Sequence, residues 1–583
     1  MKVEKIAPGL LMALEDLQEE GRRGLTRHVR TLGLVSAERS PKPARTVVFV
    51  HCAEEAPLEH LAAYAIRVNQ RRGKVRTAFL PLENLDPLSE DPAIERIIPS
   101  RYLRLLMDVA PKKVNVPDFR KATGLSGKGV IIGVVDTGID PNHQAFKGRI
   151  LRIWDQKLHG PGVQEGDYGA EFTGALLSVS RDEEGHGTHV AGIAAGADNT
   201  FSGVAPEADL VIVRTDLMDA HIADGIRYIY RVATELGRPA VVNLSLGGHW
   251  DAHDGTDSLS QIIDDESRNG RIVCCAAGNE GSDNIHAQTK VTKGRTRTIR
   301  FRVPVSPDTG AIRIATLNGW YPGSDQIEVG VQSPGGFRTP FQGAVTAGPV
   351  GRSYQLPDGR VRVFTPGPDP ASGDHSFLIE IGNANRSSPP ITPGIWRIWL
   401  RGAEIRDGRV DVWAIDESQL LDVIFTGRSV KDSMKIGSPG AATRAVTVAS
   451  ITTKVRWTDI DGNPQEVHFD LDNISDFSSE GPLRNGRQKP DVAAPGAMVA
   501  SALSADSLVD RGDIVATGYR TMAGTSMATP FISGLVALLL QRDPHLDPDG
   551  VKALLQAHSS IPGQPAGTFD PKWGFGRIDA RSL

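Results

Sequence analysis

The chain has 583 residues, enough for about three to five domains, so a single small module is excluded. Its 65 Lys and Arg against 70 Asp and Glu give a formal net charge of −5, which argues against a nucleic-acid or anionic-membrane partner. Hydrophobic residues at 40% and charged residues at 23% are the proportions of a folded chain rather than of a disordered one.

The N-terminal residues and the cysteines favour a cytoplasmic protein. The apolar run 6–14 is followed by Glu15 and Asp16, where a signal peptide would need small residues. The chain has 3 cysteines, too few for a disulfide framework, and two of them are adjacent and poorly placed to bridge each other. The apolar run 531–540 is about half of the roughly 20 residues that span a bilayer, so no membrane segment is expected.

Two segments precede the first long apolar strand. Leucines at helical spacing predict a helical extension over 1–44, which ends in the polar, proline-containing link SAERSPKPA. Residues 45–109 then alternate between strand and helix patterns, a β-α-β-α-β unit that is marginal in size for independent folding. Its predicted elements are a strand at 45–52, a helix at 57–70, a strand at 74–82, a short helix or turn at 84–93 and a strand from 94.

Residues 110–289 predict the first part of an α/β domain. Continuous Val and Ile runs, rather than alternating ones, are typical of strands covered on both faces, as in a mostly parallel sheet flanked by helices. The predicted strands lie at 129–136, 209–214, 239–248 and 271–279, and the predicted helices at 186–196 and 223–236.

From residue 296 to about residue 415 the apolar period changes to two. Ile299, Phe301 and Val303, for example, alternate with Arg300 and Arg302. Seven such short strands with no helical stretch predict a β-sandwich over 290–430, inserted into the α/β domain. The α/β pattern resumes over 431–583, with an apolar helix that begins near residue 525.

Three polar residues stand where an α/β unit places its chemistry. Asp136 ends a buried strand, although an acid there is often only a cap. His186 and His189 open a helix; they could be metal ligands, but no third Cys or His cluster accompanies them, so His189 is expected to be a buried, hydrogen-bonded residue. Ser526 begins the apolar helix, where it could be only an N-cap.

The three together predict nucleophilic catalysis. A serine hydroxyl is a poor nucleophile at neutral pH unless a neutral imidazole takes its proton and a buried carboxylate orients that imidazole. The order Asp, His, Ser along the chain is one that serine peptidases use.

The surrounding sequence resembles a known family. DTGID around Asp136, HGTHVAGI from His186 and GTSMATP around Ser526 resemble the three active-site blocks of the subtilisin-like serine peptidases, the subtilases of peptidase family S8. The resemblance implies a subtilisin-like α/β fold and a serine endopeptidase in which these three residues are catalytic. Peptide or protein substrates are the implied partners.

Two further blocks resemble the substrate-binding parts of that family. VVNLSLGG implies that Ser245, Leu246 and Gly247 offer backbone groups to an extended peptide, and AAGNEG implies an oxyanion-hole amide at Asn279. The same block implies a primary specificity pocket lined by Ala276, Ala277 and Gly278. Such an amide donor is worth roughly 100–1000-fold in rate, although an asparagine after a strand can also simply shape a turn.

The resemblance extends to the accessory segments. Residues 45–109 resemble the family's N-terminal propeptide, with a ferredoxin-like fold, which assists folding and inhibits until it is cut; self-processing and a bound propeptide are implied. The loop ADNTFS is shorter than the loop that forms the strong calcium site in secreted subtilisins, so no metal or other cofactor is expected. IWDQ at 153–156 and the sandwich resemble the Csp-like subtilases of spore-forming bacteria, which carry a jelly-roll insertion here.

Two other functional hypotheses remain to be compared. A pseudoenzyme or interaction scaffold on this fold would have lost triad residues, whereas all three are present here. An esterase or lipase of the α/β-hydrolase type would need G-x-S-x-G and the order Ser, Asp, His, but Ala528 stands at the last glycine's place. The sandwich is either a substrate-access or partner-binding module, or a brace that stabilises its host.

Overall fold

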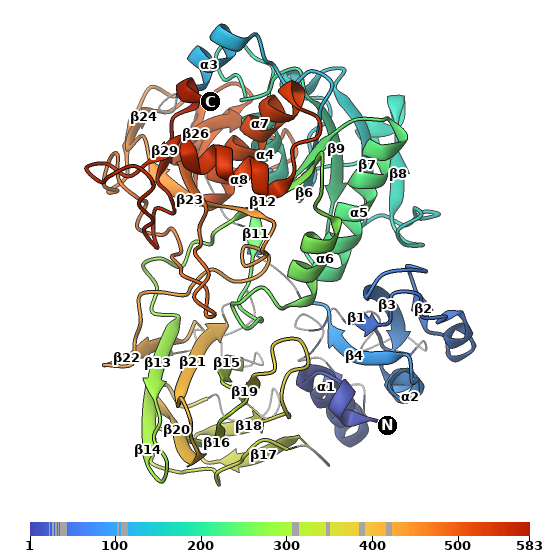
Figure 1. The fold of residues 1–583 in the computed structure, drawn as a ribbon, viewed down its shortest axis with the longest axis vertical. Coiled ribbons are helices and arrows are strands. Elements are labelled where there is room, and N and C mark those ends of the chain that lie inside the picture. Colours follow the sequence, from blue (N-terminus) through green and yellow to red (C-terminus); the bar gives the residue numbers. More distant parts are fainter. Residues whose placement is uncertain are drawn as a thin grey trace. The chain divides into compact units, whose positions relative to one another are not determined.

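The computed structural model describes the chain except for residues 22–23, 26–27, 29–31, 33, 35–42, 102–103, 106–114, 306–313, 346–349, 384–390 and 416–421 (Figure 1). Its contacts divide it into two units, which are described separately. The first unit comprises Met1–Tyr102, His249–Ala252 and Asp283–Asp432, and the second comprises Leu103–Gly248, His253–Ser282 and Ser433–Leu583.

The second unit is built on a 12-stranded sheet. Seven neighbouring strands in the order β7-β9-β6-β10-β12-β23-β26 pair in parallel. Their bounds are β6 Ile131–Asp136, β7 Ile150–Asp155, β9 Asp209–Arg214, β10 Ala240–Leu244, β12 Arg271–Ala276, β23 Val446–Thr452 and β26 Val492–Ala502. The mostly parallel sheet predicted from the apolar runs is thus confirmed.

Short strands complete this unit. They are β8 Ala170–Phe172, β27 Ile514–Ala516, β28 Tyr519–Ala523, β29 Ser559–Ser560 and β30 Arg577–Ile578 in the large sheet, the pair β5 Arg104–Leu105 and β11 Leu246–Gly247, and the hairpin β24 Arg456–Thr458 and β25 Pro464–Glu466. The helices are α3 Val116–Thr123, α4 His186–Ala195, α5 Asp219–Glu235, α6 Ser258–Glu266, α7 Thr525–Arg542 and α8 Pro548–Ala557.

Helices cover both faces of the sheet, as β6 illustrates. Successive side chains of a strand point to opposite faces. Ile132 and Val134 belong to the core that includes α4 and α7. A Cβ added to Gly133, between them, would lie 2.5 Å from Ile229 of α5, so this strand has no solvated face. That arrangement explains why its sequence shows no polar alternation.

The first unit contains a four-stranded antiparallel sheet in the order β2-β3-β1-β4. Its strands are β1 Arg45–Cys52, β2 Arg67–Val68, β3 Val75–Pro81 and β4 Ile94–Pro99, and α2 Leu85–Glu90 precedes β4. The predicted strands are confirmed, but the predicted helix over 57–70 is wrong. Only a 3₁₀ turn, Glu59–Tyr64, forms there, because Ala65 takes a left-handed conformation (φ 54°) and the chain enters β2. With the 3₁₀ turn in the place of the first helix, the order of the elements corresponds to the β-α-β-β-α-β order of a ferredoxin-like unit.

The N-terminal extension forms helix α1, Pro8–Glu20, which shares a core with that sheet and with the sandwich. The core includes Leu10 and Leu14 of α1 together with Val350 and Phe364. A buried charged group accompanies it, since Arg362 donates a 2.7 Å hydrogen bond to Asp16 and the ring of His28 lies 2.5 Å from the same carboxylate oxygen. The link at 36–44 falls mainly on residues that the structure does not describe.

The inserted segment is an antiparallel sandwich of a six-stranded sheet, β13-β21-β15-β19-β18-β17, and a four-stranded sheet, β16-β20-β14-β22. The strands are β13 His286–Lys290, β14 Thr296–Val303, β15 Ile314–Tyr321, β16 Gln326–Gln332, β17 Gly351–Leu356, β18 Gly359–Phe364, β19 His375–Gly382, β20 Gly394–Glu404, β21 Arg409–Ile415 and β22 Ile424–Thr426. The seven predicted strands are present; β13, β17 and β22 were not predicted.

None of the described helices is both long and apolar enough to cross a membrane.

Candidate active site

Asp136 is the last residue of β6, at the carboxyl edge of the parallel strands, and its side chain is fully buried. One carboxylate oxygen, Oδ1, accepts a 2.8 Å hydrogen bond from the backbone amide of Thr137 and a 2.6 Å hydrogen bond from Nδ1 of His186. A carboxylate that binds Nδ1–H leaves Nε2 of the ring to act as a base. The structure therefore brings these two predicted residues together.

His186 is the first residue of α4, and two glycines flank it. Gly185, before the helix, has a φ of +77°, a conformation that other residues rarely adopt. A Cβ added to Gly187 would lie 2.2 Å from the carbonyl oxygen of Gly138 and 3.1 Å from Cβ of Asp136. Only glycine at position 187 therefore lets the helix begin this close to the strand that carries Asp136.

A second buried carboxylate, which the sequence analysis missed, fixes the start of α4. Oδ1 of Asp182 accepts hydrogen bonds from the amide of Gly185 (2.9 Å) and the hydroxyl of Thr137 (2.8 Å). Its Oδ2 accepts hydrogen bonds from the amide (2.8 Å) and the hydroxyl (2.6 Å) of Thr188. Asp182 thus ties the first turn of α4 to the residue after Asp136. Asp182 lies four residues before His186 but outside the block HGTHVAGI, and no local pattern in the sequence marks it for this role.

His189 is a structural residue, as predicted. It is fully buried, its Nε2 lies 3.2 Å from the carbonyl oxygen of Arg520, and burial holds the pKa of its imidazole well below the usual value. Across the described part of the chain, no three His, Cys, Asp or Glu side chains are grouped as a metal site would require.

Ser526 is the second residue of α7 and lies against Ser245, the residue between β10 and β11. Its hydroxyl donates a 2.9 Å hydrogen bond to the carbonyl oxygen of Ser245, and its own carbonyl oxygen accepts a 2.7 Å hydrogen bond from the Ser245 hydroxyl. The Ser526 hydroxyl is therefore hydrogen-bonded to Ser245 and not to His186. Hydrogen bonds between a nucleophile and its base are often long or poorly aligned before substrate binds.

Asn279 follows β12 and is oriented by the residue before Ser526. The backbone amide and the hydroxyl of Thr525 both lie 3.0 Å from Oδ1 of Asn279 and donate to it. Because Oδ1 is fixed, the Nδ2 amide remains as a donor for a ligand. Thr525 was not predicted, although it adjoins the nucleophile in GTSMATP.

The backbone beside Ser245 is paired as a substrate strand would be. Leu246 and Gly247 form β11, which pairs antiparallel with β5, residues 104 and 105 of the same chain. Ala276 and Ala277, predicted pocket residues, are buried with 3% and 2% exposure, and Gly278 has a φ of 114°.

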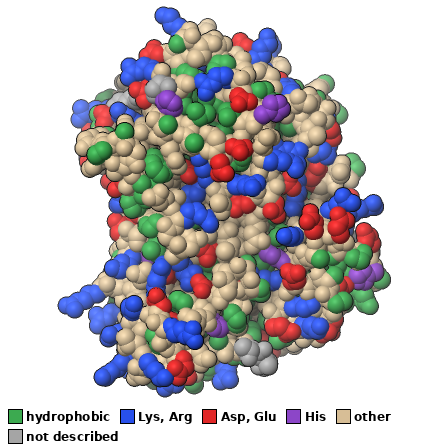
Figure 2. All heavy atoms as spheres, in the orientation of Figure 1, with side chains coloured by type: hydrophobic (Ala, Val, Ile, Leu, Met, Phe, Trp, Pro, Cys, Tyr) green, Lys and Arg blue, Asp and Glu red, His purple; other side chains and the backbone are tan. Residues whose placement is uncertain are grey.

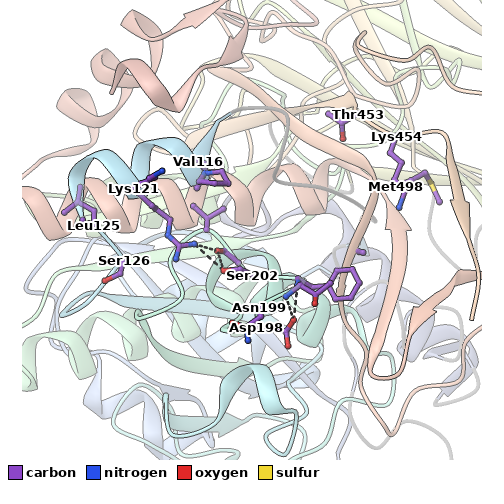
Figure 3. Close-up of a pocket in the computed structure, with 18 residues that line it drawn as sticks. Val116, Lys121, Leu125, Ser126, Asp198, Asn199, Ser202, Thr453, Lys454 and Met498 are labelled. Atoms are coloured by element: carbon purple, nitrogen blue, oxygen red, sulfur yellow. Dashed lines mark hydrogen bonds between the residues drawn. The ribbon is translucent and has the colours of Figure 1, made fainter.

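A cavity of about 880 Å³ lies apart from these residues, between α3, the loop 198–204 and Thr453, Lys454, Met498 and Ala500 (Figure 3). The loop that lines it contains most of ADNTFS, the segment whose short length argued against a calcium site. The carboxylate of Asp198 accepts hydrogen bonds from the amides of Thr200 (2.8 Å) and Phe201 (3.0 Å), so it is used by its own loop. None of the predicted site residues lines this cavity.

Comparisons with known proteins identify the family and the fold of the chain. The model of the subtilase family matches residues 127–301 and 382–576, on both sides of most of the sandwich. Serine protease AprX of Bacillus subtilis is 26% identical over 477 residues, which cover 80% of this chain and 70% of that protein. The major intracellular serine protease of the same organism is 32% identical over 199 residues, 32% of this chain and 55% of that protein.

A solved structure supports the fold. The CspB protease of Clostridium perfringens superposes with a TM-score of 0.65 at 24% identity, covering 81% of this chain and 98% of that one.

Proposed function

Because the chain belongs to the subtilase family and is a subtilisin-like serine endopeptidase, we propose that Asp136, His186 and Ser526 are its catalytic triad. The 2.6 Å hydrogen bond between His186 and Asp136, in a buried setting at the carboxyl edge of the sheet, is the observation that carries this proposal. It favours an active enzyme over a pseudoenzyme scaffold, since the chain keeps this buried pair although burying a charged group costs free energy.

In the proposed reaction, Oγ of Ser526 attacks the carbonyl carbon of the scissile bond while Nε2 of His186 takes its proton. Asp136 accepts the hydrogen bond from Nδ1 and stabilises the imidazolium that forms. His186 then gives the proton to the leaving amine, and water repeats the sequence on the acyl-enzyme to release the second product.

Negative charge develops on the carbonyl oxygen during the attack, and the proposed donor to it is Nδ2 of Asn279. Thr525 supports this role, because its two hydrogen bonds to Oδ1 fix which end of the amide faces outward. A donor that is positioned before the reaction does not have to reorganise as charge develops.

We infer that protein substrates bind as an added strand along Leu246 and Gly247. Main-chain pairing supplies affinity with little dependence on sequence, as is typical of strand addition. The pairing of β5 with β11 supports this inference, because a segment of the chain itself adds to β11 as an antiparallel strand. In this antiparallel pair residue 104 lies opposite Gly247 and residue 105 opposite Leu246, so the chain direction of β5 leads towards Ser245. The carbonyl oxygen of Ser245 accepts the hydrogen bond from Ser526.

The position of β5 supports self-processing. The junction proposed for cleavage, 103–116, contains β5, although residues 106–114 lie outside the described residues. In this proposal residues 45–109 are a propeptide that binds the cleft through its last strand.

The test is labelling with a fluorophosphonate, which modifies an activated serine, together with hydrolysis of casein. Wild type is expected to be labelled and active, and Ser526→Ala to be neither, with unchanged circular dichroism. Ser533→Ala is the matched control, since Ser533 is a buried serine of the same helix that donates instead to Asn243. Labelling of Ser526→Ala at the wild-type rate would place the nucleophile elsewhere.

A further inference from the structure

The exposed face of the four-stranded sheet of the sandwich carries arginines that pair with no described residue. On β14, the exposed Arg300 and Arg302 alternate with buried apolar residues, and on β20 the half-buried Arg397 lies between two buried residues. Figure 2 shows Lys and Arg side chains in blue at the lower left, where β14 lies in Figure 1.

The strand register places these arginines together. Arg300 lies directly opposite Arg397 in the antiparallel pair, and its neighbour on the other side is Thr426. The cross-strand neighbours of Arg302 are both apolar, Ile395 and Ile424. Like charges directly opposite each other destabilise a sheet, so folding alone gives no reason for this pairing.

These guanidinium groups have no partner in the described part of the chain: no ion pair or hydrogen bond joins Arg300, Arg302 or Arg397 to a described residue. The nearby acid, Glu328 of β16, is paired with Arg401. As far as the described residues go, the three guanidinium groups are therefore available to a ligand from outside.

Their chemistry and spacing fit an extended acidic polypeptide. Guanidinium groups bind carboxylates through two parallel hydrogen bonds. Arg300 and Arg302 are two residues apart on one strand, about 6.8 Å, which is also the spacing of alternate side chains in an extended peptide.

Two other polyanions fit less well. Single-stranded nucleic acid binds to open aromatic faces, but the ring of Trp399 on this sheet is covered by Arg338, whose guanidinium carbon lies 4.0 Å from the ring centroid. A membrane surface needs large apolar side chains among the cations. Among the described strands of this sheet, the large apolar side chain that is exposed is Ile424, at 38%.

We propose that this arginine face, defined as Arg300, Arg302 and Arg397, binds acidic stretches of the protein substrates. That the bound polypeptides are substrates rests on the proposed protease function, whereas the binding of acidic stretches does not. Attachment at a second point raises the local concentration of the polypeptide around the enzyme, and so lowers KM for proteins that carry an acidic stretch.

The binding experiment uses the full chain with Ser526→Ala, so that no probe is cut. The anisotropy of a labelled oligo-glutamate peptide is titrated with this protein, with Arg300→Gln/Arg302→Gln/Arg397→Gln added, and with the control Lys128→Gln/Lys147→Gln/Arg268→Gln added. The control removes three exposed cations from the second unit, none of which has an ion pair among the described residues. Three exposed ion pairs are together worth about tenfold in affinity.

The expected result is binding that weakens about tenfold in the arginine variant, is kept in the control and falls as salt rises. Equal binding by all three proteins would overturn the proposal, as would an equal loss in variant and control, which would show an effect of net charge alone. Tighter binding of oligothymidylate of the same charge, lost with the same arginines, would also overturn it in favour of nucleic acid.

Kinetics separate this proposal from the proposed function. With Ser526 restored, the arginine variant is expected to hydrolyse a short neutral peptide as wild type does, and to show a raised KM only for a protein with an acidic stretch. An inactive wild type with intact oligo-glutamate binding would refute the protease proposal and leave the arginine face standing. The single variant Arg300→Gln is expected to fold with an unchanged or higher Tm, because it removes one half of the like-charge pair.

Discussion

Nδ1 of His186 lies 2.6 Å from Oδ1 of Asp136, and both side chains are almost completely buried. One residue ends a strand and the other begins a helix, so the distance depends on how closely helix and strand approach. Gly187 and Asp182 set that approach, the first by having no side chain and the second by its four hydrogen bonds.

Asp136→Asn is expected to lower kcat about 10⁴-fold, because an amide in this place favours the wrong imidazole tautomer. Hydrolysis of a chromogenic peptide measures it, with circular dichroism as the check on folding. The double variant Asp136→Asn/Ser526→Ala is expected to have nearly the same kcat as Ser526→Ala alone, since the members of a triad act as a unit. The exposed Asp506→Asn is the control. Losses that multiply in the double variant would contradict a shared role.

Asn279→Ala is expected to lower kcat roughly 100–1000-fold with little change in KM, because its donor acts mainly on the transition state. Thr525→Val is expected to have a smaller effect of the same kind, since it removes the hydroxyl that donates to Oδ1 and keeps the amide. Steady-state kinetics of both variants distinguish the two parameters. A rise in KM at constant kcat would show that Asn279 binds the ground state instead.

The pH dependence of kcat/KM is expected to rise between about pH 6 and 8, because the proposed base must be neutral and an ordinary histidine titrates near 6.5. The profile is measured with a peptide that has no ionisable group in this range. A flat profile from pH 5 to 9 would count against His186 as the base.

The first unit is expected to lose stability as the pH falls from about 6.5 to 4. Burial, helped by the charge of Arg96, lowers the pKa of His51 on β1 to about 4. The unfolded chain binds a proton at about pH 6.5 and the folded chain does not, so the stabilisation is complete above 6.5 and is lost towards 4. The difference amounts to about 3 kcal/mol.

Urea unfolding at a series of pH values measures this loss. His51→Gln is expected to flatten the dependence, whereas the control His545→Gln, at an exposed side chain of the second unit, is expected to leave it unchanged. The same acid slope in His51→Gln and in wild type would assign the effect to other groups.

Wild-type protein is expected to be cut once between residues 103 and 116, and Ser526→Ala to remain full length. The reason is that β5 pairs with β11, the strand along which substrates are proposed to bind, and β5 lies within the junction proposed for cleavage. N-terminal sequencing and intact mass identify the cut. A wild-type chain that stays whole yet hydrolyses casein would refute self-processing.

The sequence predicted the strands whose apolar pattern follows directly from the number of their buried faces. Strands β6, β9, β10 and β12 are continuous Val and Ile runs because both faces are covered, and the seven alternating strands of the sandwich have one buried face. Strand β17 was missed because it is mostly polar on both sides, and a helix was predicted at 57–70 because no local pattern reveals the left-handed Ala65.

The candidate site was predictable where short motifs name its residues and unpredictable where tertiary contacts supply them. Asp136, His186 and Asn279 stand in recognisable blocks, and the structure places the first two in contact. Asp182 acts through four hydrogen bonds to three other residues, a relation that appears only after the chain has folded.

Thr525 and Ser526 are successive residues of α7, so one helix carries the proposed nucleophile and the anchor of the proposed oxyanion donor. A shift of α7 as a rigid helix would carry both residues together, so the position of Thr525 relative to Ser526 does not depend on how α7 packs against the sheet. His186 belongs to another helix, α4, so its distance from Ser526 depends on how α4 packs against α7. We therefore expect the transfer of the proton to fail first on heating, while oxyanion binding persists.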